Sequence, residues 1–295
     1  MAQTDPLVKP RWRSLLYVPV TSERFVEKAH TRGADAVTLE LEDGVAPSEK
    51  ERARGLVGSA APIVGQSGAD VLVRINRPWE LAVKDIEASI CEDVCGLVLP
   101  KVDTAEHVRA IAEVVEAVER DRGLPIGHTV FFLRIESPKG VLNVAEIAGA
   151  HPRVVALGLG AGDFSFSLGV PHNGLAVTIA AYQVVLAAVA AGRTPLGLAS
   201  TITDFADLDE FRLVAAEACR LGFRGAPCIH PSQVPVLNEV FSPTPEERER
   251  AQRIIDEYET ALAQGVGAIV TASGEFVDIP VYEYAKRTLD QASAD

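Results

Sequence analysis

The chain has 295 residues, of which 47% are hydrophobic and 23% are charged, and its formal net charge at pH 7 is −13. This composition supports a sizeable hydrophobic core and excludes an intrinsically disordered chain. The negative balance, without a cluster of lysine and arginine, argues against a nucleic-acid-binding surface. An anionic small molecule is still compatible with it, provided that basic groups are concentrated in a cleft.

The cysteines and the N-terminus point to a cytoplasmic protein. Cys91, Cys95, Cys219 and Cys228 form no C-x-x-C pair, which favours reduced thiols over a disulfide framework or a zinc site. The first 13 residues lack the apolar stretch of a signal peptide.

Residues 174–192 carry no charged side chain, and two interpretations are open for them. The segment is long enough to raise the question of a membrane span. Its alanine content and its position between two strand-like runs favour a buried helix, and a subunit interface would explain why the helix is apolar on every side. We therefore expect no membrane association.

Strand-like and helix-like patterns alternate along most of the chain. The strand-like runs are 14–20, 36–43, 71–76, 96–101, 130–137, 154–160, 194–200 and 226–231, and the helical patterns include 104–121 and 207–222. This alternation predicts an α/β fold, a (β/α)₈ TIM barrel, over residues 13–242. A doubly wound sheet is the competing architecture, but no glycine-rich phosphate loop follows the first strand, and "GLGAGDF" (158–164) lacks the G-x-G-x-x-G order.

Residues 243–295 have a different character. They begin with Ser/Pro punctuation and acidic residues, continue as a helix, and reach a second helix after a turn at Ser273–Gly274. We interpret them as a C-terminal helical extension, too short for an independent core.

Polar side chains stand at the ends of almost all the predicted strands. They are Glu40, Glu42, Asp43, Arg74, Asn76, Lys101, Glu136, Asp163 and His230. The carboxyl ends of barrel strands converge on one cleft, where the active sites of such barrels lie. Several groups of mixed sign on different strands therefore predict a functional site.

Glu136 and Asp163 follow adjacent strands, the fifth and the sixth. Two carboxylates that are close repel each other unless a cation lies between them or one is protonated. Hard oxygen ligands of this kind suit Mg²⁺, with Mn²⁺ as a possible substitute. The alternative is a structural ion pair with Arg74 or Lys101.

Arg74, Lys101 and His230 each have two interpretations. Arg74 can present a planar set of donors to a carboxylate or to a developing oxyanion, or it can form an ion pair inside the barrel. Lys101 could form a Schiff base, but the carboxylates nearby favour an electrostatic or hydrogen-bonding role. His230 could act as an acid or base, although holding the turn after the eighth strand is the favoured interpretation.

A family resemblance rests on eight fragments that occur in order. They are "RSLLYVPV", "LELEDGVAPSEKERAR", "VRINRP", "LVLPKV", "IESPKGVLN", "GAGDFSFSLG", "LGFRGAPCIHPSQV" and "GEFVDIPVYEYA". Over about residues 13–290 the chain resembles the citrate lyase β-subunit-like proteins and the malyl-CoA and citramalyl-CoA lyases of the HpcH/HpaI aldolase/citrate lyase superfamily.

The resemblance implies a Mg²⁺-dependent barrel in which Glu136 and Asp163 bind the metal. It implies that Arg74 holds the substrate and stabilises its oxyanion, and we add Lys101 as a catalytic residue. It further implies a homo-oligomer, a trimer or hexamer, in which the C-terminal lid of a neighbouring subunit supplies Asp278 as acid or base.

The chain departs from the family pattern at several positions. Gly162 stands where the family often has glutamate, Glu40 where aspartate is usual, and "TPLGLAST" (194–201) lacks an acidic residue near the seventh strand; "YVPV" replaces "VPG". These departures leave Glu136, Asp163 and Arg74 unchanged. They affect which acyl substrate is expected and how CoA is bound.

Substrate binding is assigned to both acidic and basic residues. Arg74, Glu42 and Asp43 are expected to bind the substrate. Arg13, Arg24 and Lys28 are candidates for the CoA phosphates, although solvation on a helix surface is the favoured interpretation of these three.

Three functions follow from this sequence. The first is a Mg²⁺-dependent lyase that cleaves a 3-hydroxyacyl-CoA, such as malyl-CoA or citramalyl-CoA, into a 2-oxo acid and an acyl-CoA. The second is a thioesterase that uses the same metal site with water as the second reactant. The third is a catalytically weakened binding or assembly subunit.

Overall fold

The structure is a computed structural model that describes residues 10–201 and 207–292. The chain divides into two compact units, Met1–Asn238 and Glu239–Asp295. The boundary expected from the sequence, after residue 242, is close to this division.

The first unit is built on one parallel sheet with the strand order β7-β6-β5-β4-β3-β2-β1-β8. Its strands are β1 (Ser14–Pro19), β2 (Ala36–Glu40), β3 (Asp70–Arg74), β4 (Gly96–Leu99), β5 (Val130–Ile135), β6 (Val154–Leu159), β7 (Thr194–Pro195) and β8 (Ala226–Cys228). Two backbone hydrogen bonds join the segments at its two edges, from Arg224 N to Pro195 O (2.9 Å) and from Gly197 N to Gly225 O (2.8 Å). The sheet is therefore curled and joined at its edges, which confirms the predicted TIM-barrel fold.

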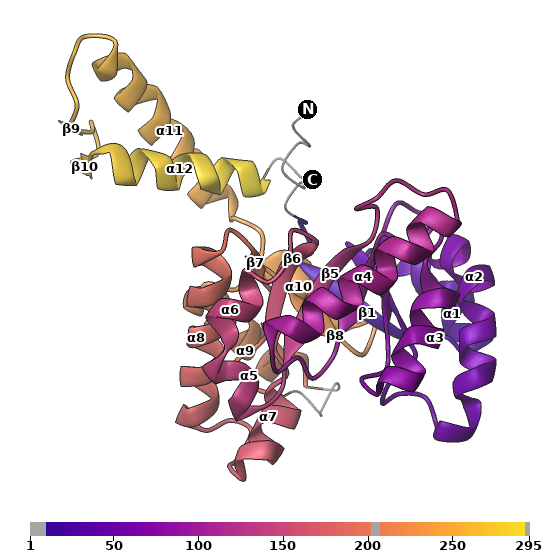
Figure 1. The fold of residues 1–295 in the computed structure, drawn as a ribbon. Coiled ribbons are helices and arrows are strands. Elements are labelled where there is room, and N and C mark those ends of the chain that lie inside the picture. The colour runs from indigo at the N-terminus through magenta and orange to yellow at the C-terminus, as the bar shows by residue number, and fades with distance from the viewer. Residues whose placement is uncertain (1–9, 202–206, 293–295) are drawn as a thin grey trace. The chain divides into compact units, whose positions relative to one another are not determined.

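The helices of this unit connect the strands and flank the sheet (Figure 1). They are α1 (Glu23–Ala29), α2 (Lys50–Gly65), α3 (Trp79–Ser89), α4 (Ala105–Asp121), α5 (Pro138–Leu142), α6 (Val144–Ala148), α7 (Ala161–Leu168), α8 (Leu175–Ala190), α9 (Leu208–Leu221) and α10 (Gln233–Val240). The longest of these helices, α4, shows how the sequence determines where a helix begins and which of its faces is buried. Thr104 caps its first turn by accepting a hydrogen bond from His107 N, and Val108, Ile111 and Val115 form a buried stripe at helical spacing.

An apolar layer fills the interior of the barrel near the amino ends of the strands. Its residues are Trp12, Leu15, Ala36, Leu72, Val98, Phe132, Val155, Ala156 and Leu196, all buried. Side chains alternate along a strand, so residues two positions after an interior residue face the interior again. Tyr17, Arg74 and Arg134 occupy such positions after Leu15, Leu72 and Phe132, and they form a polar layer above the apolar one.

Most observed strands are shorter than the sequence patterns suggested. The largest difference is at 194–200, where β7 covers only Thr194–Pro195. Gly197 follows with a φ of 157°, an extended conformation that lies at the edge of what other residues adopt. At the other strands, the residues beyond the observed ends lie in loops, and these loops carry the polar groups of the site.

The helix expected over 174–192 is α8, and it is buried on one face only. Val177, Ala181, Val184 and Ala188 are buried against the barrel. The opposite face exposes an apolar stripe, made of Leu175, Ile179, Tyr182, Leu186 and Val189. In the described residues, no helix combines the length and apolar character that a membrane span requires.

The second unit is a helical hairpin with a small two-stranded sheet. It contains α11 (Pro245–Leu262), β9 (Ile269–Val270), β10 (Phe276–Val277) and α12 (Ile279–Ala292). Thr244 and Glu247 form a capping box at the start of α11. Tyr258 stacks on Tyr282 with 4.9 Å between ring centroids, within a small core that also holds Ile254, Val277 and Ala285. The expectation that this segment is too short for a core of its own is therefore wrong, because its two helices bury apolar side chains against each other.

Candidate active site at the carboxyl ends of the strands

Glu136 is one of three buried acidic residues of the candidate site, with Glu40 and Glu42. It follows β5, is only 4% exposed, and accepts a hydrogen bond from the backbone N of Lys101 at 2.9 Å through Oε2. Arg134 Nε lies 3.4 Å from the other carboxylate oxygen. A side chain at Gly160 would clash with Glu136, so the glycine leaves the space that this carboxylate occupies. The fold thus holds a buried carboxylate in a fixed place.

Asp163 lies in the first turn of α7, directly after β6, and is exposed. Burial raises the pKa of Glu136 above its ordinary value; Arg134 opposes that shift, whereas the negative charge of Asp163 adds to it. The two predicted metal ligands are thus close enough to interact electrostatically.

These residues fit a magnesium ion. Mg²⁺ is usually held by one or two carboxylates and completes its shell with water and substrate oxygens. The described residues contain no group of three or more His, Cys, Asp or Glu side chains that could hold a metal, so no closed zinc or calcium cage is found among them. Glu136 and Asp163 are the residues that would hold the ion.

Arg74 lies in a network of buried charges at the end of β3. Its Nε and Nη2 atoms each lie 2.6 Å from Oε2 of Glu40, and Nη1 lies 3.2 Å from Oε2 of Glu42. Burial raises the pKa of Glu40, and Arg74 counteracts that shift. The ion pair considered as an alternative role for Arg74 is therefore present. It does not exclude a role in substrate binding, because the guanidinium also borders a pocket.

Lys101 connects this network with Glu136. Its ammonium group forms a short ion pair with Glu42 and lies 3.0 Å from Asp43, while its backbone N–H reaches Glu136. Partial burial works against the charge of Lys101, but hydrogen bonds to Glu42 and Asp43 raise its pKa above the ordinary value. A Schiff base requires a neutral amine, so this environment favours the electrostatic role.

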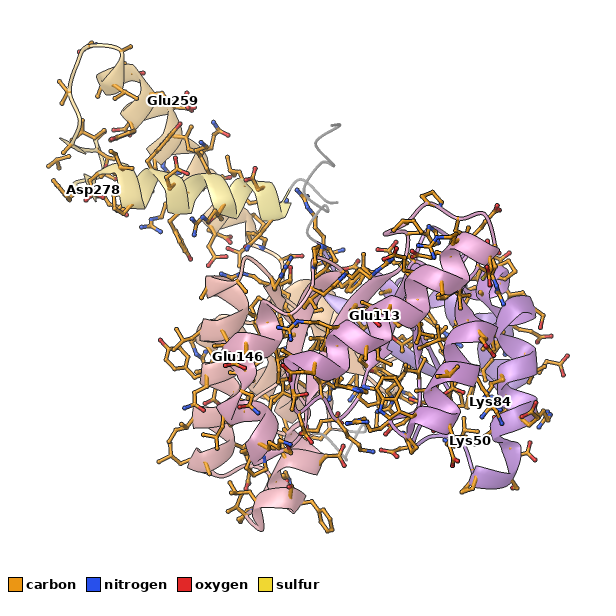
Figure 2. The ribbon with its side chains drawn as sticks, in the orientation of Figure 1. Lys50, Lys84, Glu113, Glu146, Glu259 and Asp278 are labelled. Carbon is orange, nitrogen blue, oxygen red and sulfur yellow. The ribbon has the colours of Figure 1, made fainter. Side chains whose placement is uncertain are left out.

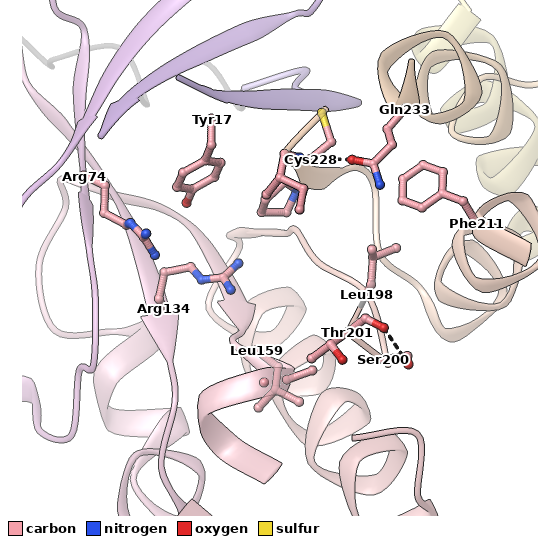
Figure 3. Close-up of a pocket in the computed structure, with 14 residues that line it drawn as sticks. Tyr17, Arg74, Arg134, Leu159, Leu198, Ser200, Thr201, Phe211, Cys228 and Gln233 are labelled. Atoms are coloured by element: carbon pink, nitrogen blue, oxygen red, sulfur yellow. Dashed lines mark hydrogen bonds between the residues drawn. The ribbon is translucent and has the colours of Figure 1, made fainter. Parts of the chain in front are cut away.

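A pocket of about 200 Å³ opens above the apolar layer (Figure 3). Tyr17, Arg74 and Arg134 line it from the strands, and Gly162, Thr201 and Gln233 line it from the segments beyond them. Figure 3 shows the guanidinium groups of Arg74 and Arg134 and the ring of Tyr17 directed toward this space. Sequence reasoning missed Tyr17 and Arg134. The alternation of side chains along β1 and β5 places them on the same strand faces as Leu15 and Phe132, but only the structure shows that these faces are interior.

Arg13 lies at the amino end of β1, away from these groups. Its Nε and Nη2 atoms pair with the carboxylate of Asp35 at 2.9 Å. The structure thus does not bring Arg13 together with the residues at the carboxyl ends of the strands. The other two candidates for the CoA phosphates, Arg24 and Lys28, are exposed on α1, which follows the carboxyl end of β1.

His230 and Asp278 both have local structural partners. His230 Nδ1 lies 2.7 Å from Ser232 Oγ, and Gln233 Oε1 accepts the backbone N–H of His230 at 3.1 Å, a geometry that supports a turn-holding role. Asp278 belongs to the second unit and precedes α12 (Figure 2). Its Oδ1 atom accepts a hydrogen bond from Val281 N at 3.3 Å, as a helix N-cap does.

Comparison with known proteins shows the family to which the chain is related. Residues 13–231 match the HpcH/HpaI aldolase/citrate lyase family. The chain is 32% identical to citrate lyase subunit beta of Leuconostoc mesenteroides subsp. cremoris, covering 96% of this chain and 94% of the relative. It is 34% identical to an L-malyl-CoA/beta-methylmalyl-CoA lyase of Cereibacter sphaeroides, covering 98% and 97%.

A solved structure extends the comparison. The protein CitE of Mycobacterium tuberculosis, in complex with magnesium, acetoacetate and coenzyme A, matches with a TM-score of 0.72 and 28% identity, covering 95% of this chain and 97% of that one.

Proposed function

The chain belongs to the HpcH/HpaI aldolase/citrate lyase family, as an oxo-acid lyase similar to citrate lyase beta, and we propose that it is a Mg²⁺-dependent lyase of 3-hydroxyacyl-CoA thioesters. Malyl-CoA and citramalyl-CoA represent the substrate class, and a 2-oxo acid and an acyl-CoA are the products.

One observation carries the proposal. The carboxylate of Glu136 is buried at the end of β5, against a glycine that leaves room for it, with Asp163 near enough to affect its pKa. Burying a carboxylate is unfavourable unless a cation or hydrogen bonds compensate. Among the residues that the structure describes, Glu136 has only the Lys101 backbone N–H and a long contact with Arg134. A bound Mg²⁺ would supply the compensating charge and polarise the substrate oxygen. The magnesium in the related CitE complex supports this assignment.

The residues around this carboxylate have distinct roles in the proposed cleavage. The substrate hydroxyl gives its proton to the Asp278 carboxylate, the bond between the hydroxyl-bearing carbon and the carbon next to the thioester breaks, and the electron pair of that bond passes to the thioester enolate. The hydroxyl carbon becomes the oxo carbon. Arg74 donates hydrogen bonds to the oxygen on that carbon as negative charge develops on it. Lys101 holds Glu42, Asp43 and Glu136 in place. Asp278 moves the proton to the enolate carbon, which yields the acyl-CoA.

We also propose that the protein is a homo-oligomer, a trimer or hexamer, in which the C-terminal unit of one subunit completes the site of another. The exposed apolar stripe of α8 supports an interface with a second copy. The second unit likewise exposes apolar side chains, including Val270, Phe276 and Ile279. Closure by such a unit would exclude water from the enolate.

The test is release of a 2-oxo acid, measured with lactate dehydrogenase, from malyl-CoA and from citramalyl-CoA, with Mg²⁺ and with EDTA. We expect metal-dependent release from one thioester and its loss in Glu136→Gln. Free thiol without an oxo acid would indicate the thioesterase instead. Bound Mg²⁺ with no reaction of any thioester would indicate a binding subunit or a different hydroxy acid.

A further inference from the structure

Lys101 has an unusual backbone conformation. In the part of the chain that the structure describes, it is the one residue other than glycine with a positive φ, of 52°. This left-handed conformation is unfavourable for a residue with a Cβ atom, and it persists only where the surroundings hold it. In this conformation the backbone N–H of Lys101 donates to Glu136 Oε2 at 2.9 Å, while its ammonium group pairs with Glu42 and Asp43. The contacts that hold Lys101 therefore also affect where Glu136 lies.

The peptide groups on both sides of Lys101 are bonded to neighbouring segments. Arg77 Nε donates to Lys101 O at 3.1 Å, from the loop that follows β3. Val102 N donates to Arg134 O, in β5, at 3.1 Å. The chain that leaves β4 is thus anchored to the segments on either side of it.

A further connection uses two side chains, those of Asp103 and Ser137. Ser137 Oγ donates to Asp103 Oδ1 at 2.5 Å and accepts the backbone N–H of Gly140 at 2.9 Å. Ser137 directly follows Glu136, and Asp103 comes two residues after Lys101. The bond therefore joins the segment that carries the buried carboxylate to the segment that carries its N–H donor.

The packing between the two segments is close. A Cβ atom on Gly140 would lie 2.6 Å from Val102 O, so the approach requires glycine. Asn143 Nδ2 donates to Asp103 O at 2.9 Å, which adds a second bond to the backbone of Asp103. A hydrogen bond from a hydroxyl to a carboxylate is stronger than one between neutral groups. The Ser137–Asp103 bond is thus well placed to keep the two segments together.

We propose that Asp103 and Ser137 are positioning residues, whose hydrogen bond holds Lys101 in its left-handed conformation and thereby fixes the Glu136 carboxylate for metal binding. The inference rests on the metal site of the proposed function. Both residues act through other groups, Asp103 through the backbone of Lys101 and Ser137 through its peptide bond to Glu136. A ligand that is held in place before the ion arrives loses less conformational freedom on binding.

The first test needs no metal. Backbone amide exchange of the metal-free, full-length protein, followed by mass spectrometry of overlapping peptides, reports on residues 101–103. We expect exchange there to become about 10-fold faster in Ser137→Ala and in Asp103→Ala, with β1 unchanged, because the Lys101 N–H leaves Glu136 more often. Ser137→Thr keeps a hydroxyl and Asp103→Asn keeps an acceptor oxygen, so both should exchange as the wild type does.

The second test is Mn²⁺ affinity, measured by electron paramagnetic resonance. Both alanine variants should bind about 10-fold or more weakly, as changes around a metal ligand typically do, and both conservative variants should bind nearly as the wild type does. The double variant Ser137→Ala/Asp103→Ala should bind as weakly as Asp103→Ala alone, because both changes remove the same bond. Ser137 also caps α5, so Thr244→Ala, which removes the N-cap of α11, is the matched control and should leave Mn²⁺ binding unchanged.

Three results would overturn the proposal. Unchanged exchange at residues 101–103 in both alanine variants would show that the pair does not hold Lys101. Faster exchange with the Mn²⁺ affinity of the wild type would show that Glu136 does not depend on the pair. A loss in Asp103→Asn as large as in Asp103→Ala would assign the effect to the charge of Asp103 and not to its hydrogen bond. A wild type that binds no Mn²⁺ would instead contradict the metal site of the proposed function, and the exchange data would still decide whether the pair holds the Lys101 N–H on Glu136.

Discussion

Gly160 and Glu136 follow the neighbouring strands β6 and β5 and pack so closely that a Cβ atom on Gly160 would lie 2.5 Å from Glu136 Oε1 and 2.8 Å from its Cδ. The backbone N of Gly160 donates to Ile135 O at 2.8 Å, which fixes the glycine against β5. Its φ of −84° is open to any residue, so the requirement for glycine is one of space. The glycine thus determines where the buried carboxylate lies.

Gly160→Ala should therefore weaken metal binding. The added methyl group must displace Glu136, and disturbing the surroundings of a metal ligand typically costs about 10- to 100-fold in affinity. Mn²⁺ titration followed by electron paramagnetic resonance measures the effect. Gly55→Ala in α2, where a Cβ meets nothing within 4 Å, is the matched control and should bind Mn²⁺ as the wild type does. Equal affinity in Gly160→Ala would show that Glu136 is not a ligand.

The two roles of Arg74 can be separated by a pair of substitutions. Arg74→Gln alone leaves Glu40 without its partner, and breaking a buried ion pair in this way costs about 3–5 kcal/mol. Adding Glu40→Gln removes the unpaired charge, so the free energy of unfolding, measured with urea, should recover substantially. Turnover should stay reduced by about 10²- to 10³-fold in the double variant if Arg74 stabilises the oxyanion. Recovery of turnover together with stability would restrict Arg74 to charge balance.

Much of the candidate site could be predicted because its residues end apolar runs. Glu40, Lys101 and Glu136 each end an apolar run at the carboxyl end of a strand. In a barrel, the carboxyl ends of the strands face the cleft. The barrel itself followed from the alternation of patterns. The family resemblance then assigned the metal ligands, which the residue types alone left open.

Tyr17 and Arg134 could not be found in the same way. They lie inside the strand runs "SLLYVP" and "VFFLRI", where a polar residue can face either the interior or the surrounding helices. Which face is interior depends on the register of all the strands, and only the structure shows that Leu15 and Phe132 belong to the interior layer. The short β7 was also unpredictable, because "TPLGLAS" has a strand-like composition, but its backbone leaves the sheet after Pro195.

His107 should make the barrel sensitive to acid. It packs edge-on against Trp79, with 5.0 Å between ring centroids, and burial lowers its pKa to about 4, with a further contribution from Arg77. The unfolded chain takes up this proton near pH 6.5, so the free energy of unfolding should fall as the pH falls from about 6.5 to about 4. Urea unfolding across this range should show a shallower dependence in His107→Gln. An unchanged slope would mean that His107 is protonated in the folded state.

Asp278 is expected to act in a neighbouring subunit, and complementation between two inactive variants tests this. Asp278→Asn keeps an oxygen that can cap α12, so the free energy of unfolding should stay near that of the wild type, while turnover should fall by about 10²- to 10⁴-fold. Glu136→Gln should be inactive for a different reason, the loss of a metal ligand. After subunit exchange in an equal mixture, about a quarter of the sites combine an intact Glu136 with an intact Asp278 from the neighbour, and activity should return in that proportion. If mass spectrometry confirms mixed oligomers and activity stays absent, Asp278 does not complete a neighbour's site.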